Sequence, residues 1–229
     1  MQLTPIGTEV LHQASSLLDQ MRNVRRTAKS QPSVLQTSLR IAAPSTACHY
    51  LLPNVLREFV ESFPNIHISM DPCGAEEALS QLSDGLVDLA IYPIQDVPKS
   101  MDSLLLGKDE LRFIIPPAHP WTHRSRAKDI AEQLLIAPDR FSDTRKLIAA
   151  HFARENITPK TRIETGSEEA IKQFVRLGLG IGILPEWTAR EEVESGALCS
   201  VPLGRRRLIR TWMALHPRKH RLTVAEGLF

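Results

Sequence analysis

Four short segments of the sequence combine small polar side chains with the expected starts of helices. They are Ser45 and Thr46; Cys73 and Gly74; Ser142, Asp143 and Thr144; and Thr165, Gly166 and Ser167. The N-terminus of a helix presents unpaired backbone N–H groups and about half a positive charge, so hydroxyl groups beside it favour a carboxylate or another anion. Arg145 would add a cation. The alternative is that each hydroxyl only caps its helix, but four corresponding positions favour a shared ligand site.

These segments lie in a sequence that nearly repeats itself once. Residues 74–93 match residues 166–185 at a constant offset of 92, without a gap. A glycine, two glutamates, an alanine, a glutamine, an isoleucine and a proline coincide. Each copy predicts a helix, a tight turn and a buried strand. Two such units predict two similar α/β lobes with a ligand cleft between them, because open α/β sheets bind ligands beyond the carboxyl ends of their strands.

The surrounding pattern places each copy in a β-α-β-α-β order. Strands are expected at 39–44, 66–70 and 86–91 in one lobe and at 134–137, 161–164 and 179–184 in the other. Thr165 and Glu168 are typical of a capping box, with Thr165 as the N-cap. Strands at 110–117 and 210–216 would pass between the lobes as a hinge, and residues 222–229 would form a last helix.

The predicted fold is therefore α/β, with two Rossmann-like lobes joined by a two-strand hinge. We expect one lobe at 38–113 plus 212–229 and the other at 117–208. Residues 1–30 predict a separate linker and dimerisation helix, because Thr4 and Pro5 are typical of a helix start. Apolar residues then recur with the alternating spacing of a two-stranded coiled coil: Val10, Ala14, Leu17, Met21, Val24 and Ala28. A terminal helix packed on its own domain is the alternative.

The composition narrows the functional class. The 229 residues are 42% hydrophobic and 24% charged, which is ordinary for a soluble globular protein. The formal net charge of +2 does not favour an electrostatic nucleic-acid binder. No apolar run reaches the roughly 18 residues of a membrane span, and the start does not resemble a secretory signal. Three widely spaced cysteines predict no disulfide framework, so we expect a cytoplasmic protein.

Other candidate sites are weaker. The histidine pairs 119/123 and 216/220 each enclose a proline, which interrupts the helix that would align them, so we predict neither a metal nor a cofactor. The glycines of 178–182 follow a helix and enter a strand, the reverse of a dinucleotide-binding loop, and indicate close packing. Cys73 has no resolving cysteine nearby, which favours an apolar filler over a redox sensor.

Several motifs together resemble those of LysR-type transcriptional regulators. Leu3-Thr4-Pro5-x-Gly7 is similar to the family's junction between its winged helix-turn-helix and its linker helix. The regulatory-domain pattern is followed by Leu39-Arg-Ile-Ala-Ala-Pro44, Tyr50-Leu-Leu-Pro53, Phe63-Pro64, Gly85-x-x-Asp88-Leu-Ala-Ile91, His119-Pro120 and Gly178-Leu-Gly-Ile-Gly-Ile-Leu-Pro185. The resemblance covers nearly the whole chain and implies a periplasmic-binding-protein type II-like fold. The DNA-reading domain is missing from the sequence, so we expect this chain alone to bind promoter DNA weakly or not at all.

The resemblance also implies a function. It implies a cytoplasmic, homodimeric or homotetrameric transcription factor, not an enzyme, in which a small effector, often a carboxylate, binds between the lobes and alters the oligomer arrangement. Carried over by position, the effector contacts are Ser45, Thr46, Cys73, Gly74, Phe141, Ser142, Asp143, Thr144, Thr165, Gly166 and Ser167. A periplasmic-type solute-binding protein is the main alternative, but it would need an export signal. An enzyme is the other, with only Cys73 and His49 as reactive side chains near the cleft.

Overall fold

The computed structural model describes residues 38–94, 96–122, 127–140, 142–204 and 206–218, together with Glu226 and Phe229. The linker helix predicted at 1–30 and most of the last helix predicted at 222–229 lie outside these residues. Within them, no helix is long and apolar enough to cross a membrane.

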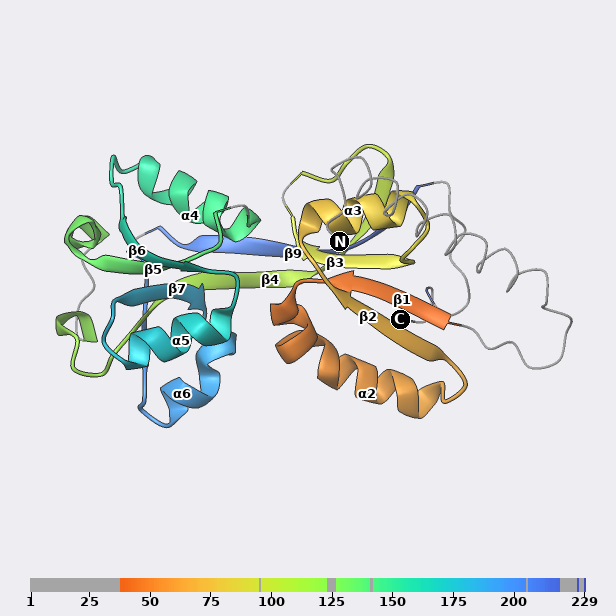
Figure 1. Ribbon diagram of the computed structural model, residues 1–229, viewed down its shortest axis with the longest axis horizontal. Helices are drawn as coiled ribbons and strands as arrows, with labels where there is room; N and C mark the ends of the chain where they lie inside the picture. Colours follow the sequence, from red (N-terminus) through yellow and green to blue (C-terminus); the bar gives the residue numbers. More distant parts are fainter. Residues whose placement is uncertain are drawn as a thin grey trace, which may run out of the picture.

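One mixed sheet organises the described chain. Its strands are β1 (Ser38–Ala43), β2 (His67–Pro72), β3 (Leu89–Pro93), β4 (Met101–Ile115), β5 (Leu134–Pro138), β6 (Lys160–Thr165), β7 (Ile181–Pro185), β8 (Cys199–Val201) and β9 (Leu208–Pro217). The spatial order is β2-β1-β3-β9-β4-β7-β5-β6, and β8 pairs with β4. β1 is parallel to β2 and β3, and β5 is parallel to β6 and β7. The antiparallel pair β4 and β9 runs through both halves and joins them (Figure 1).

Helices cover both faces of each half. The α-helices are α2 (Leu52–Ser62), α3 (Ala75–Ser83), α4 (Asp143–Ala153), α5 (Glu168–Arg176) and α6 (Arg190–Glu194), and shorter turns are η1 (Ala47–Leu51), η2 (Pro120–Thr122), η3 (Ala127–Glu132) and η4 (Glu186–Ala189). Figure 1 shows α2 and α3 on opposite sides of one half, and α4 and α5 on opposite sides of the other. The sequence repeat corresponds to α3 with β3 and to α5 with β7.

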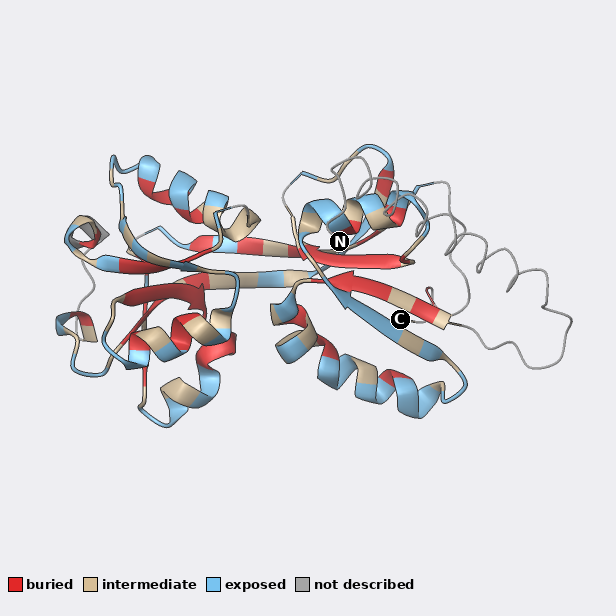
Figure 2. Cartoon of the chain, in the orientation of Figure 1, coloured by how far each residue is buried: buried red, intermediate tan, exposed pale blue. Residues whose placement is uncertain are grey.

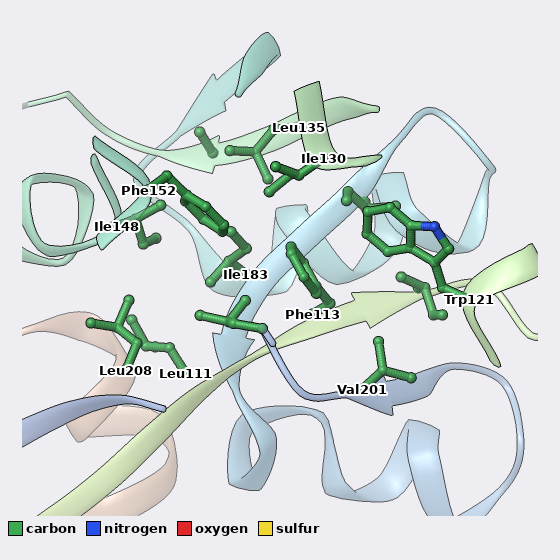
Figure 3. Packing of buried hydrophobic residues seen from close by; sticks show 14 residues of the cluster. Leu111, Phe113, Trp121, Ile130, Leu135, Ile148, Phe152, Ile183, Val201 and Leu208 are labelled. Carbon is green, nitrogen blue, oxygen red and sulfur yellow. The ribbon is translucent and has the colours of Figure 1, made fainter. Parts of the chain in front are cut away.

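The alternation of side chains along the strands builds two hydrophobic clusters in each half. In β1, Ile41 faces the cluster under α2, whereas its neighbour Ala42 faces the cluster under α3. The inner strands β1, β3 and β7 are therefore largely buried, whereas the edge strands β2 and β6 and the outer sides of the helices are largely exposed (Figure 2). Figure 3 shows the cluster between α4 and the sheet, where Phe113 packs on Phe152 and Trp121.

The glycines near β7 and the start of β4 can be compared with their predictions. Close packing of the glycines near β7 is confirmed, because a Cβ at Gly182 would lie 2.8 Å from Ile171 Cγ2 and one at Gly180 would lie 2.3 Å from Leu134 O. The strand predicted at 110–117 is wrong in its start, because β4 begins at Met101. Its first half carries three exposed leucines in a row and a bulge before Gly107, so only its pairing with β9 identifies it as a strand.

Candidate functional site

A cavity of about 1080 Å³ lies between the two halves, at the carboxyl ends of β1, β2, β5 and β6. It is lined by these residues predicted from the sequence: Ser45, Thr46, Cys73, Gly74, Ser142, Asp143, Thr144, Thr165 and Gly166. Ser167 does not line it, and Phe141 lies outside the described residues. Segments that are far apart in the chain therefore meet around one cavity, because neighbouring parallel strands end at the same edge of a sheet.

Three helix N-termini begin at this cavity. Gly74 is the N-cap of α3, Ser142 that of α4 and Ser167 that of α5. The Ser142 hydroxyl accepts a hydrogen bond from the Arg145 backbone N–H at 3.1 Å, and the Ser167 hydroxyl accepts one from the Ala170 N–H at 3.2 Å. The hydroxyl groups of these two serines therefore cap helices, which was the alternative to a direct contact with a ligand. The helix ends they fix bring partial positive charge to the cavity.

The predicted capping box at α5 is wrong. Thr165 does not cap the helix; its hydroxyl accepts a hydrogen bond from the Ser167 backbone N–H at 3.2 Å, in the turn before α5. The helix begins at Glu168 with Ser167 as its N-cap, whereas Thr165 as N-cap would have started the helix at Gly166. Thr165 and Ser167 lie two residues apart, and the turn between them makes Ser167 the N-cap.

A buried ion pair supplies the cation of the cavity. Arg210 lines the cavity with only 2% of its surface exposed. Its Nε and Nη2 atoms donate to Asp109 at 2.9 and 2.6 Å, and its Nη1 donates to the Thr144 hydroxyl at 3.0 Å. Asp109 also accepts from the indole N–H groups of Trp187 and Trp212 at 3.1 and 2.9 Å. The pair therefore holds the guanidinium in one place between β4, β9 and α4.

The prediction that Arg145 adds a cation to the site is wrong. Arg145 does not line the cavity, and its guanidinium donates instead to the Thr161 hydroxyl at 2.7 Å. Arg210 and Asp109 face each other in the register of β9 and β4 although they are 101 residues apart in the chain. No local pattern links them, so only strand pairing could reveal the pair.

A second charged network connects the two halves beside the cavity. Lys172 in α5 is 4% exposed, and its Nζ lies 2.8 Å from carboxylate oxygens of both Glu169 and Glu192. The same Nζ donates to the Tyr50 hydroxyl of η1, in the other half, at 3.0 Å. Burial lowers the pKa of Lys172, but the two carboxylates outweigh burial, so the pKa is raised and the ammonium is retained.

Cys73 forms part of the cavity wall. The Tyr92 hydroxyl donates to the Cys73 carbonyl oxygen at 2.8 Å and lies 3.4 Å from the Cys73 Sγ atom. Burial raises the pKa of the Cys73 thiol, so the thiol stays protonated near neutral pH. Among the described residues, no three His, Cys, Asp or Glu side chains gather as metal ligands.

Comparisons with known proteins extend this description. A family profile described as the LysR substrate binding domain matches residues 33–229. The probable RuBisCO transcriptional regulator of Trichormus variabilis (strain ATCC 29413 / PCC 7937) is 26% identical over 99% of this chain and 70% of that protein. The RuBisCO operon transcriptional regulator of Allochromatium vinosum is 27% identical over 99% of this chain and 76% of that protein.

Solved structures share the fold. The CcmR regulatory domain of Synechocystis PCC6803, in complex with 2-PG, has a TM-score of 0.77 and 25% identity over 85% of this chain and 94% of that one. The effector binding domain of QuiR, in complex with shikimate, has a TM-score of 0.74 at 20% identity over 84% of this chain and 92% of that one, and shows the fold alone. These likenesses confirm the predicted α/β fold of the type II periplasmic-binding-protein kind. The relatives are transcriptional regulators rather than enzymes, and the chain belongs to the LysR family as the effector-binding domain of a LysR-type transcriptional regulator.

Proposed function

We propose that the cavity between the halves binds a small anionic effector, with a carboxylate as its acidic group. The observation that carries this proposal is the convergence of the Arg210 guanidinium and three helix N-termini on one hollow of about 1080 Å³. Both features favour negative charge. The complexes of CcmR with 2-PG and of QuiR with shikimate support a small-molecule ligand in this fold.

The predicted site residues take different parts in this proposal. Thr144 brings a hydroxyl group to the acid, and Thr46 bonds to the Glu168 carboxyl in the cavity wall. The rest of the wall around the acid includes Ser45, Cys73, Gly74, Thr165 and Gly166. Ser142 and Ser167 act through the helix starts that they cap. Asp143 is the first residue of α4 and lines the cavity, and Phe141 remains a prediction from the family pattern.

Effector binding would act through the arrangement of the halves. β4 and β9 are the strands that join them, and the contact between Lys172 and Tyr50 bridges them beside the cavity. A ligand held by both halves favours one arrangement only if it binds that arrangement more tightly. We propose that this preference changes the arrangement of a homodimer or homotetramer paired through residues 1–30. Promoter DNA would be bound through an N-terminal DNA-binding domain, as in the family.

The other two functions have less support. A periplasmic-type solute-binding protein shares the two-lobed fold, but the relatives over nearly the whole chain are transcriptional regulators. An enzyme would need an activated group in the cavity, whereas burial raises the pKa of the Cys73 thiol.

A ligand screen tests the proposal. The chain is titrated with carboxylates, phosphate esters and uncharged sugars while its thermal unfolding is followed. An acid at 100 times its dissociation constant should add about 2.7 kcal/mol, which raises the melting temperature of a chain of this size by about 5–10 °C. If no acid raises the melting temperature, or if only uncharged sugars do, the anion site is wrong.

A further inference from the structure

The carboxyl group of Glu168 is buried in the wall of the cavity for which we propose an anionic ligand. Glu168 is the first residue of α5 and lines the cavity. Its Oε2 atom is buried and, within the described part of the chain, has no hydrogen-bond partner. Buried polar atoms of native proteins are nearly always paired, so the missing partner of Oε2 points to the ligand.

The sequence repeat shows that this burial is specific to one half. Glu76 occupies the same position of the repeat, at the first turn of α3, and also lines the cavity. Glu76 is exposed, whereas the carboxyl group of Glu168 is enclosed between the halves. Two glutamates with the same local motif therefore have different surroundings, and only one of them lacks a partner for a buried oxygen.

The groups around Glu168 leave one of its oxygens available. Burial raises the pKa of the Glu168 carboxyl, and the Asp109 carboxylate of β4 acts in the same direction. The Arg210 guanidinium of β9, a hydrogen bond with Thr46 and the Lys172 ammonium of α5 oppose this rise. Burial outweighs these three groups, so the pKa of the carboxyl is raised overall, and none of the three bonds to Oε2.

The charges of the cavity point to the same kind of ligand. Its acidic lining residues are Glu76, Glu77, Asp139, Asp143 and Glu168, and its basic lining residues are Lys146 and Arg210. Acidic side chains therefore outnumber basic ones. A ligand that is only an anion would match Arg210 and the helix ends but would be repelled by the acidic side chains of the wall.

We propose that the effector carries a hydrogen-bond donor, a hydroxyl or an ammonium group, next to its acidic group, and that this donor binds Glu168 Oε2. The inference rests on the proposed anion site and narrows its ligand class to hydroxy acids and amino acids. Because a buried acceptor without a partner costs free energy, an analogue that lacks the donor should bind about 10- to 100-fold more weakly.

Succinate, malate and aspartate test this inference, because they share one dicarboxylate frame and carry a hydrogen, a hydroxyl or an ammonium at the same carbon. Propyl phosphate and glycerol 3-phosphate, which differ by two hydroxyl groups, form a second pair. Dissociation constants are measured by calorimetry with the full chain at constant pH. Malate, aspartate and glycerol 3-phosphate should each bind more tightly than the partner without a donor.

Three variants test whether Glu168 causes the preference for a ligand with a hydrogen-bond donor. Glu168→Met removes both oxygens and should abolish the preference for a donor in both series. Glu168→Gln keeps an oxygen acceptor without the charge, so it should keep a preference for malate and lose that for aspartate. Glu191→Gln removes an exposed charge from α6, away from the cavity, and should bind as the unmodified chain does. Unfolding temperatures show that each variant is folded.

The outcomes separate this inference from the proposed function. Equal binding of the partners with and without a donor, or a preference that survives Glu168→Met, overturns the inference and leaves the anion site standing. Binding of succinate that strengthens at low pH without any preference for a donor also overturns it, since Glu168 would then supply the proton itself. Failure of every acid in both series to bind overturns the proposed function as well.

Discussion

At the scale of single residues, the hydroxyl groups around the cavity do not have equal roles. The Ser142 hydroxyl is engaged in its own turn, because it donates to the Asp139 carbonyl oxygen at 2.8 Å and accepts from the Arg145 N–H. Thr46 has no such capping bond and instead contacts the Glu168 carboxyl. Residue type alone does not distinguish the two, since both precede a helix.

Thr46→Ala and Ser142→Ala should therefore affect different quantities. Thr46→Ala should lower the affinity for an anionic probe such as malate by about 1–3 kcal/mol, because the Glu168 carboxyl in the cavity wall loses the hydrogen bond that positions it. Ser142→Ala should lower the free energy of unfolding by about 1 kcal/mol, because α4 loses its cap. Calorimetric titration and urea unfolding of both variants measure the contrast. Equal effects of the two on affinity would contradict it.

The ion pair of Arg210 and Asp109 leads to a prediction about stability. Their side chains are 3% and 6% exposed, so Arg210→Gln leaves a carboxylate buried without its cation. The free energy of unfolding should fall by about 3–5 kcal/mol. Arg218→Gln is the matched control, because Arg218 and Asp102 are 62% and 42% exposed and their pair should contribute less than about 1 kcal/mol. A similar loss in both variants, measured by urea unfolding, would show that burial is not the cause.

At the scale of elements, the repeat produces two helix-turn-strand units with the same backbone turn. Gly85 ends the first helix and Gly178 the second, with φ angles of 68° and 71°. Only glycine adopts this left-handed conformation without strain. The units differ in packing, because β7 approaches α5 closely at Gly182.

Gly182→Ala tests this close packing. The added Cβ would lie 2.8 Å from Ile171 Cγ2 and 3.3 Å from Val175 Cγ2, so α5 must move away from β7. The free energy of unfolding should fall by about 1–3 kcal/mol. Gly107→Ala is the control, because nothing lies within 4 Å of a Cβ there. Urea unfolding compares them, and an unchanged stability of Gly182→Ala would contradict the packing.

At the scale of the whole molecule, polar contacts beside the cavity link the two halves. Lys172 and Tyr50 form one such contact, and the Tyr50 ring packs edge-on against Trp187 at 5.9 Å. Under the proposed function, a hinge of two strands with contacts of this kind on one side would permit two arrangements of the halves. The effector would select between them.

The coupling between the halves is measurable. Tyr50→Phe removes the hydrogen bond to Lys172 but keeps the ring, and Lys172→Met removes the ammonium. A double-mutant cycle in urea unfolding should give a coupling of about 0.5–1.5 kcal/mol for this bond. A coupling of zero would mean that the contact does not hold the halves together.

Much of the fold follows from local patterns in the sequence. Alternating and helical spacings predicted the strands and helices of both halves, since each depends on neighbours within a few residues. Glycines and small polar residues marked the helix starts that surround the cavity. The start of β4 escaped prediction because its three exposed leucines show no alternation and its identity depends on pairing with β9.

The sequence by itself determined the family, the two-lobed fold and the segments that meet at the cavity, because these depend on short-range spacing and on repeated motifs. Only the tertiary structure decided which charged groups face the cavity. Arg210 and Asp109 meet across 101 residues through strand pairing, and Glu168 is enclosed whereas its repeat counterpart Glu76 is exposed. Burial and charge pairing are set by atoms distant in the chain, so equal local motifs acquire unequal chemistry.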